Sequence, residues 1–274
     1  MKRFEGKVAV VTGAGGDIGA ATAIRLAAEG ASVALFDRKL ELLADTAEAV
    51  RRTGITDIEC YGVDQVDRAA VDAAVTAASD RFGRIDVLFA NAGYGQFGSF
   101  LEMSERQWSR HIDVNLTGTF NVCQAIARQM VGFRQGGAIV INASSGAVQY
   151  ADHLSAYCTT KAGLRMLAIG MASELGGHRV RVNTVMPGVI ETGMTSPMLA
   201  EGDHLEVILA ETPVGRLGHA ADVAALVCFL ASDDAGYING ESVLIDGGQT
   251  IHGHPRWFRT DYRKAHEEQW EIGR

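Results

Sequence analysis

Short apolar runs alternate with longer amphipathic stretches along most of this chain. Seven runs are rich in β-branched residues or continuously apolar, as expected of strands buried on both faces. These runs are Val8–Val11, Ser32–Phe36, Glu59–Val63, Val87–Ala90, Ala138–Ala143, Arg181–Met186 and Ser242–Ile245. Between them, apolar residues recur at a spacing of three to four, which is typical of helices packed on one side. The predicted helices cover residues 18–29, 39–53, 67–82, 107–131, 155–176 and 220–232.

This alternation predicts an α/β fold, namely a doubly wound, parallel, seven-stranded sheet with helices on both faces. No linker or repeat divides the pattern, so we expect a single domain over residues 1–250. Residues 189–218 form a long insert after the sixth strand. Because ligands of open α/β sheets bind at the carboxyl ends of the strands, this insert is predicted to be a lid.

A C-terminal tail, residues 251–274, also falls outside the pattern of strands and helices. It places Trp257 and Phe258 among charged residues, and large apolar side chains are costly to leave in water. We therefore expect the tail to pack on a neighbouring subunit or on the entrance of the site. A solvated, disordered extension is the alternative.

Composition narrows the possible partners. The 274 residues carry a formal net charge of −8, which argues against a general nucleic-acid or anionic-membrane surface. No stretch approaches the roughly 20 apolar residues that span a bilayer, and no signal-peptide pattern opens the chain, so a cytoplasmic protein is expected. The four cysteines are scattered without metal-ligand spacing, so no metal site is predicted and each is expected to be a buried apolar residue.

A glycine-rich turn connects the first predicted strand to the first predicted helix. Its sequence is Thr12-Gly13-Ala14-Gly15-Gly16-Asp17-Ile18-Gly19. Glycines allow a tight turn and a close approach of the backbone to a pyrophosphate, and the helix N-terminus offers free N–H groups to that anion. A glycine-rich turn alone is weak evidence, but its strand–turn–helix context favours a dinucleotide site.

Asp37, at the end of the second strand, suits the adenosine ribose of such a dinucleotide. Its carboxylate can accept hydrogen bonds from ribose hydroxyls and would repel a 2′-phosphate. The glycine turn holds no Lys or Arg, so NAD is the predicted cofactor. Two observations leave alternatives open: Asp37 could instead cap the following helix, and the adjacent Arg38 could accommodate a 2′-phosphate.

Tyr157 and Lys161 are four residues apart in a predicted helix and should therefore share one face. An ammonium beside a phenol favours the phenolate and is expected to lower the phenol pKa from about 10 toward neutrality. Such a phenol can take a proton from an alcohol and return it to a ketone. An isolated pair of this kind would more often be surface residues of an amphipathic helix.

The combination of motifs resembles the classical short-chain dehydrogenase/reductase family, from about Lys7 to Gly248. The family's TGxxxGxG turn corresponds to Thr12–Gly19, and its NAG motif to Asn91-Ala92-Gly93. Its Ser…Tyr-x-x-x-Lys pattern corresponds to Ser144, Tyr157 and Lys161. The helix Asn-x-x-Gly pattern at Asn115 and the Pro-Gly turn at Pro187-Gly188 with Thr192 also match. This resemblance implies a Rossmann-type fold and an NAD(H)-dependent oxidoreductase that interconverts a secondary alcohol and a ketone.

The resemblance also implies roles for the matching residues. Tyr157 is expected to be the general acid and base, assisted by Ser144, Lys161 and Asn115, with Asn115 holding a water that links Lys161 to solvent. Ser145 is a rival to Ser144, although the strand register favours Ser144; Asn115 could instead be a surface residue at a helix kink. The residues expected to contact the cofactor are Gly13, Gly16, Asp17, Ile18, Gly19, Asp37, Asp64, Asn91, Gly93, Tyr157, Lys161, Pro187, Ile190 and Thr192.

Two positions depart from the family pattern. Asp17 replaces the middle glycine of the turn, and its charge could weaken the binding of a pyrophosphate. Gln65 follows Asp64 where the family has a small apolar residue against the adenine.

The substrate itself is not encoded in a motif. The candidate pocket residues are mostly apolar or aromatic, which favours a neutral, cyclic or aromatic alcohol or ketone. They are Tyr94, Phe97, Val148, Tyr150, His153, Met186, Met194 and Met198. A homotetramer is expected, because long helices pair between subunits in this family. The alternatives are a sugar-nucleotide epimerase relative, which usually carries a larger C-terminal domain, and a non-catalytic NAD-binding sensor, which would be expected to lose part of the Ser/Tyr/Lys set.

Overall fold

The computed structural model describes residues 2–251, and these form one α/β domain around a seven-stranded sheet. All neighbouring strands are parallel, in the order β3-β2-β1-β4-β5-β6-β7. The strands are β1 (Val8–Thr12), β2 (Ser32–Asp37), β3 (Ile58–Gly62), β4 (Val87–Ala90), β5 (Gly137–Asn142), β6 (Val180–Pro187) and β7 (Ser242–Ile245). The strand order reverses between β1 and β4, and a cleft is expected at the carboxyl edge of the sheet there.

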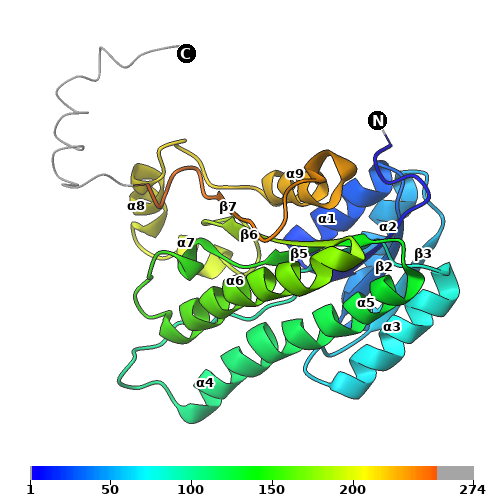
Figure 1. Ribbon diagram of the computed structural model, residues 1–274. Helices are drawn as coiled ribbons and strands as arrows, with labels where there is room; N and C mark the ends of the chain where they lie inside the picture. Colours follow the sequence, from blue (N-terminus) through cyan, green and yellow to red (C-terminus); the bar gives the residue numbers. More distant parts are fainter. Residues whose placement is uncertain (1, 252–274) are drawn as a thin grey trace.

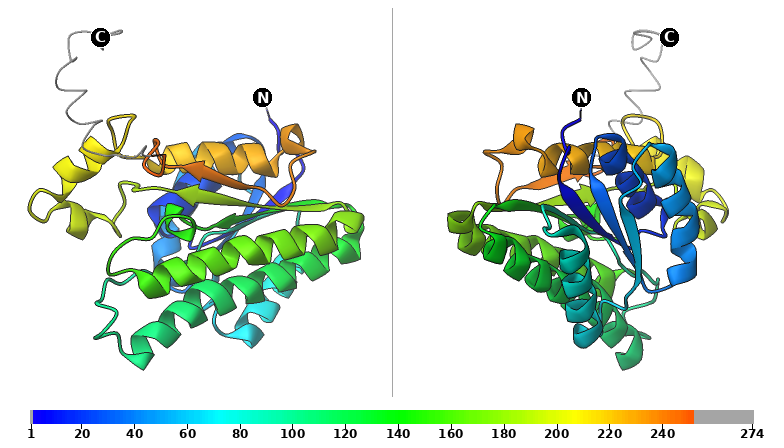
Figure 2. Two further views of the ribbon diagram at one scale, coloured as in Figure 1. Left: turned by 60° about the vertical axis from the view of Figure 1, so that its left-hand side comes forward. Right: turned by 90° about the vertical axis from the view of Figure 1, so that its right-hand side faces the viewer.

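Helices cover both faces of the sheet (Figures 1 and 2). One face packs against α1 (Asp17–Ala28), α2 (Leu43–Arg52) and α9 (Ala220–Ala231). The other packs against α3 (Arg68–Phe82), α5 (Thr119–Phe133) and α6 (Ser155–Leu175). Within β1, Ala9 and Val11 belong to the first core and Val10 to the second. Burial on both faces is why the strand is apolar at every position until Thr12.

The sequence pattern predicted all seven strands to within a residue or two, and the doubly wound parallel sheet is confirmed. Two predicted helices are not continuous. A 3₁₀ turn, η1 (Leu40–Leu42), precedes α2. The long helix predicted over 107–131 consists of α4 (Glu105–His111), a π-helical stretch η2 (Ile112–Gly118), and α5. Periodicity cannot distinguish these forms, because a local change of hydrogen-bond register leaves the apolar stripe nearly intact.

The insert at 189–218 contains two short helices that the sequence pattern did not indicate. They are α7 (Ser196–Leu199) and α8 (His204–Glu211). The remaining elements are three single 3₁₀ turns, η3 (Ser145–Ala147), η4 (Gly176–His178) and η5 (Asp233–Ala235). Residues 252–274 of the tail, including Trp257 and Phe258, lie outside the described residues.

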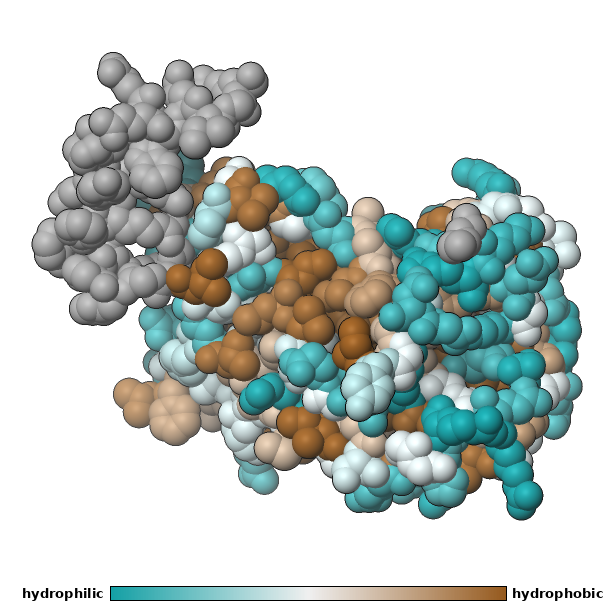
Figure 3. All heavy atoms as spheres, turned by 45° about the horizontal axis from the view of Figure 1, so that its top comes forward, coloured by the Kyte–Doolittle hydropathy of each residue, from teal (hydrophilic) through white to brown (hydrophobic). Residues whose placement is uncertain are grey.

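Apolar side chains gather on the face where α9 and β7 lie (Figure 3). Phe229 of α9 and Leu244 of β7 are both 37% exposed, and β7 is an edge strand of the sheet. Within residues 2–251, no helix is both long and apolar enough to cross a membrane.

Candidate active site

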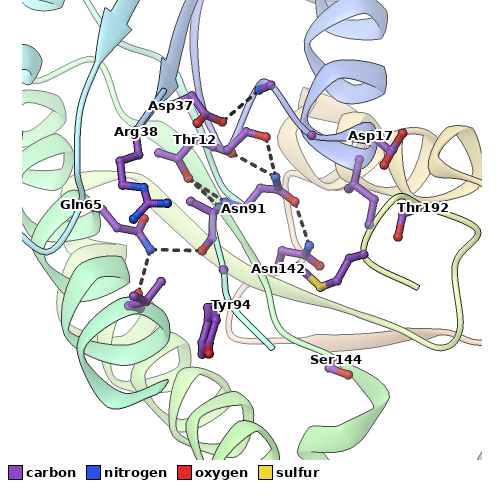
Figure 4. Close-up of a pocket in the computed structure, with 18 of the residues that line it drawn as sticks. Thr12, Asp17, Asp37, Arg38, Gln65, Asn91, Tyr94, Asn142, Ser144 and Thr192 are labelled. Atoms are coloured by element: carbon purple, nitrogen blue, oxygen red, sulfur yellow. Dashed lines mark hydrogen bonds between the residues drawn. The ribbon is translucent and has the colours of Figure 1, made fainter. Parts of the chain in front are cut away.

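A cleft of about 560 Å³ opens at the carboxyl edge of the sheet. Its walls come from the ends of β1, β2, β4, β5 and β6, from α6, and from the first residues of the 189–218 insert. Of the predicted site residues, all line this cleft except Gly19 and Asn115. The strand order therefore brings together residues that are far apart in the sequence (Figure 4).

The glycine turn between β1 and α1 packs closely against the loop after β4. Gly13 has φ = +61°, and a Cβ there would lie 2.9 Å from Ala92 Cα. Gly19 is buried, and a Cβ on it would lie 2.1 Å from the Gly13 carbonyl oxygen. Gly19 is not among the described residues that line the cleft, and it lies behind the turn, where only a hydrogen atom leaves α1 room to pack, so its contact with a cofactor stays a prediction.

Asp37 lies at the mouth of this turn. Its Oδ2 accepts a hydrogen bond from the Gly15 N–H and its Oδ1 accepts one from the Lys39 N–H, both at 3.1 Å. The carboxylate is thus fixed beside the glycine turn rather than capping α2. Arg38 follows it and also lines the cleft, with its guanidinium on the side of Gln65 (Figure 4).

Asn91 links the ends of three strands. Its side-chain N–H₂ group donates to the Thr12 and Gly13 carbonyl oxygens at 3.1 and 3.3 Å, and its Oδ1 accepts from Asn142 Nδ2 at 2.9 Å. Thr12 Oγ1 in turn accepts from the N–H groups of Asn91 and Ala92. Asn91 therefore both lines the cleft and holds β1, β4 and β5 together.

Gln65 has a structural function that the sequence did not indicate. Its buried amide donates to the Ala92 carbonyl at 3.2 Å and to the Val114 carbonyl at 2.8 Å. It therefore connects the loop after β3 to the loop after β4 and to the π-helical stretch η2. Asp64 beside it is exposed and lines the cleft, with Oδ1 accepting from the Val66 N–H.

Ser144, Tyr157 and Lys161 converge at the end of β5 and the start of α6. Ser144 follows β5, lines the cleft and interacts with the Tyr157 hydroxyl, whereas Ser145 is not among the described residues that line the cleft. The Lys161 ammonium is buried and donates to the Asn142 carbonyl oxygen at 2.8 Å. It also lies 5.5 Å from the centre of the Tyr157 ring.

The pKa values of the pair differ from the sequence expectation. Burial raises the pKa of Tyr157, an effect that the hydrogen bond with Ser144 partly offsets. Burial also lowers the pKa of Lys161 to about 8. The predicted lowering of the phenol pKa by Lys161 is therefore wrong for the chain alone, because the ammonium hydrogen-bonds to a backbone carbonyl while the phenolate loses solvent.

Asn115 is fully buried in η2, so it is not a surface residue at a kink. Its Oδ1 accepts from the Tyr94 N–H at 2.7 Å, and its Nδ2 donates to the Tyr94 carbonyl at 2.8 Å and to Thr160 Oγ1 at 3.1 Å. It lies behind Gly93, where a Cβ would be 3.5 Å from Asn115 Oδ1 and 3.6 Å from Lys161 Nζ. Asn115 thus fixes the wall of the cleft next to Lys161.

Of the predicted substrate-pocket residues, Tyr94 and Met194 line the cleft. Met186 is only 3% exposed and packs within β6, so its assignment to the pocket is wrong; its strand position points it into the core. Phe97, Val148, Tyr150 and His153 lie on the two loops 95–103 and 148–154, which the Gly98 N–H joins by donating to the His153 carbonyl at 2.9 Å.

Sequence reasoning missed several further residues of the cleft, among them the polar residues Asn142 and Arg110. Asn142 ends β5, and its Oδ1 is buried without a hydrogen-bond partner among the described residues. A polar residue closing an apolar strand was the signal for it. Arg110 lines the cleft with its guanidinium 4.6 Å from the centre of the Tyr94 ring, and no sequence signal placed that α4 residue beside Tyr94.

The cleft suits a dinucleotide next to a proton-transfer site. At one end, glycines bring the backbone of a helix N-terminus close to the cleft, as binding of a diphosphate requires, and Asp37 lies at its mouth. At the other end, a phenol, a hydroxyl and an ammonium face the same space.

Comparison with known proteins finds a family model and several relatives that match most of this chain. Residues 13–250 match the family model described as "Enoyl-(Acyl carrier protein) reductase". The chain is 40% identical to D-threitol dehydrogenase of Mycolicibacterium smegmatis, over 91% of this chain and 95% of that one. It is 38% identical to L-rhamnose 1-dehydrogenase (NAD(P)(+)) of a Sphingomonas species, over 92% and 99%. The solved structure of carveol dehydrogenase from Mycobacterium avium in complex with NAD is 30% identical, covers 92% of this chain and 100% of that one, and has a TM-score of 0.87.

Proposed function

Because the chain belongs to the short-chain dehydrogenase/reductase family, whose members bind nicotinamide cofactors, we propose that it is an NAD-preferring enzyme that interconverts a secondary alcohol and a ketone. It is an oxidoreductase acting on CH–OH groups. The observation that carries the finer proposal is the convergence of Ser144, Tyr157 and Lys161 in one cleft with the glycine turn.

In the proposed mechanism Tyr157 transfers the proton. In the reducing direction its hydroxyl donates a proton to the substrate oxygen as the carbonyl carbon gains a hydride; in the oxidising direction the phenolate accepts that proton. NADH, when bound, supplies the hydride. Ser144 holds the substrate oxygen through its hydroxyl, which already faces Tyr157. Because burial raises the pKa of Tyr157, the hydroxyl form is favoured, which suits the reducing direction.

Lys161 and Asn115 support this proton transfer. Lys161 is expected to bond the ribose next to the nicotinamide and to favour the phenolate as the proton leaves. Its pKa of about 8 keeps the ammonium form available at neutral pH. Asn115 lies behind Gly93, close to the Lys161 ammonium. There it fixes the backbone of Tyr94 through two hydrogen bonds.

The preference for NAD rests on Asp37. Its carboxylate is fixed by two backbone N–H groups at the place where the adenosine ribose is expected, and a 2′-phosphate there would face a like charge. Arg38 is the opposing feature, because its guanidinium lines the same end of the cleft. Relatives differ in this respect: the carveol dehydrogenase structure holds NAD, and the L-rhamnose dehydrogenase is named for both cofactors.

A neutral substrate is proposed. The reacting end of the cleft is lined by Tyr94 and Met194, and a Cβ on the adjacent Gly95 would be 3.6 Å from the Tyr157 ring. Arg110 reaches this region but lies over the Tyr94 ring. An apolar and aromatic lining favours a cyclic or aromatic alcohol, whereas the named relatives act on D-threitol and L-rhamnose.

A homotetramer is the proposed assembly. Closed tetramers with two-fold symmetry need two separate self-complementary surfaces. One candidate is the outward face of α5 and α6, where Phe120, Met166 and Ile169 are 40%, 64% and 37% exposed. The other is the edge of the molecule formed by α9 and β7, where Phe229 and Leu244 are each 37% exposed.

The proposal is tested by following NADH formation on a panel of secondary alcohols with NAD and NADP. The panel should contain D-threitol, L-rhamnose, carveol, and simple cyclic and aromatic alcohols. We expect turnover of at least one neutral alcohol with NAD. Tight NAD binding, measured by fluorescence titration, without turnover of any alcohol or reduction of any matching ketone would contradict an enzymatic function.

A further inference from the structure

Asp17 contacts a segment that lies far from it in the sequence. It is the first residue of α1, and its Oδ2 accepts a hydrogen bond from the Gly193 N–H at 2.9 Å. Gly193 belongs to the 189–218 insert. Figure 4 shows Asp17 at the start of its helix, next to the loop that carries Thr192. The carboxylate therefore points across the mouth of the cleft, toward the insert.

The turn that carries Gly193 is fixed at its base. The Glu191 N–H donates to the Gly218 carbonyl at 2.8 Å, and the Gly218 N–H donates to the Val189 carbonyl at 3.1 Å. Within the turn, Thr195 Oγ1 donates to the Ile190 carbonyl at 2.6 Å. The tip, Gly193, is held to the body of the domain by Asp17.

The residue after Gly193 reaches the reaction centre. A Cβ on Gly95 would lie 3.9 Å from Met194 Sδ and 3.6 Å from the Tyr157 ring, so both side chains border the same small space. The position of the turn tip therefore determines where the Met194 side chain lies relative to Tyr157.

The negative charge of Asp17 needs an explanation, because the N-terminus of α1 is also the place where a cofactor diphosphate is expected. A carboxylate that pointed into the glycine turn would repel that diphosphate. The hydrogen bond to Gly193 directs it away from the turn, while the helix dipole still favours an acidic residue at this end of α1.

We propose that Asp17 is a positioning residue that ties the tip of the insert to the glycine turn, holds Met194 over the reaction centre and slows cofactor release. This inference rests on the proposed function for its effect on the cofactor, but the tie itself does not depend on it. Asp17 then acts through Gly193 on Met194 and does not touch the reacting atoms.

The first test measures the tie without substrate or cofactor. Amide hydrogen exchange of peptides covering 189–199 is compared in the wild type, Asp17→Ala and Asp17→Asn. Asn removes the charge but keeps an acceptor oxygen. We expect exchange to accelerate by about threefold to tenfold in Asp17→Ala, the range for one partly exposed hydrogen bond to a charged group, and by less in Asp17→Asn. Unchanged exchange in Asp17→Ala, or equal effects of the two variants, would overturn the proposal.

The second test measures the consequence at the cofactor. The dissociation rate of NADH, followed by stopped-flow fluorescence, should rise about threefold to tenfold in Asp17→Ala and less in Asp17→Asn. Asp45→Ala is the matched control, since Asp45 is an exposed aspartate in the first turn of α2 for which the structure shows no side-chain hydrogen bond. A rate that rises as much in this control would contradict the proposal. Altered exchange in a protein that does not bind NADH would instead contradict the proposed function and leave the tie intact.

Discussion

Tyr157 and Lys161 lie one helical turn apart on α6, but their polar atoms have different partners. The phenol faces Ser144 and the cleft, whereas the ammonium donates to the Asn142 carbonyl behind it. Burial acts on both groups in the direction of the neutral form, raising the pKa of the phenol and lowering that of the amine. Each residue can therefore be tested by a different measurement.

Tyr157→Phe should abolish turnover and leave cofactor binding nearly intact. The variant loses the only atom proposed to carry the proton, while the glycine turn and Asp37 remain. We expect kcat to fall by at least about 10²-fold, the lower end for a general acid or base, and the Kd for NADH to stay within about threefold. A Phe variant that keeps more than about a tenth of the wild-type kcat would assign the proton transfer to another group.

Lys161 is expected to make the free energy of unfolding depend on pH, and the sign of this dependence follows from its pKa. Its pKa of about 8 in the folded protein is lower than the ordinary value of 10.5, so between these values the unfolded chain binds more protons. The cost of burying the ammonium is therefore fully present below pH 8 and is relieved as pH rises. This relief should stabilise the wild type by about 2 kcal/mol between pH 7 and pH 9.5.

Lys161→Met removes this titration while keeping the length of the side chain. The difference in unfolding free energy between wild type and Lys161→Met, from urea titrations at several pH values, should move in favour of the wild type by about 2 kcal/mol over the same interval. Other groups titrate equally in both proteins and cancel. A difference independent of pH would mean that Lys161 keeps an ordinary pKa.

Asp37→Ala should narrow the preference for NAD over NADP. Removing the carboxylate removes its repulsion of the 2′-phosphate and leaves the cationic Arg38 next to it in the cleft. The ratio of kcat/KM for the two cofactors should fall by about tenfold or more, equivalent to about 1.4 kcal/mol. If the wild type uses both cofactors equally, Arg38 outweighs Asp37 and the proposed preference is wrong.

At the scale of elements, the sequence was informative wherever strands end. Asp37 could be placed at the edge of the sheet from the strand pattern, because parallel strands end at one edge, whereas Asn91, Ser144 and Pro187 were assigned to the same cleft through the family resemblance. What the pattern missed depends on contacts between distant segments. The Asp17–Gly193 hydrogen bond joins residues 176 apart, and the Gln65 bonds to Ala92 and Val114 depend on a π-helical stretch that has no periodic signature.

The glycine turn is a second case in which the sequence pattern could not predict a contact. Gly16 and Gly19 look alike in sequence, but a Cβ on Gly16 would meet its nearest atom at 3.6 Å and one on Gly19 would meet the Gly13 carbonyl oxygen at 2.1 Å. The first is an ordinary contact, and the second requires the turn and α1 to separate.

Gly19→Ala should therefore destabilise the protein and Gly16→Ala should serve as its control. Gly16 is the N-cap of α1 with φ = −97°, a conformation that alanine adopts. We expect Gly19→Ala to lose about 1–3 kcal/mol of unfolding free energy, the range for overpacking, and Gly16→Ala to lose about 1 kcal/mol or less. Both are measured by denaturant titration without cofactor. Equal losses would show that the α1 N-terminus relaxes freely away from Gly13.

At the scale of the whole molecule, the parallel sheet and the single domain could be predicted from the repeated strand–helix pattern, and the family from several motifs in a fixed order. The expectation of a tetramer came only from the family resemblance and stays a prediction. The structure adds two exposed apolar faces on different elements, one on α5 and α6 and one on α9 and β7. If these residues form contiguous apolar patches, they are candidates for interfaces between subunits.

If each face forms one two-fold interface, disrupting either should leave a dimer. Met166→Glu puts a charge on the first face and Leu244→Lys puts one on the edge strand of the second, and a charge without a partner is costly to bury in an interface. Light scattering should give four times the 29.2 kDa chain mass for the wild type, about half of that for each single variant, and the monomer mass for the double variant. Leu40→Glu, at a leucine that is 53% exposed on η1 and outside both faces, should not change the mass. A wild-type chain that is already monomeric, or single variants that remain tetrameric, would show that these faces do not join subunits.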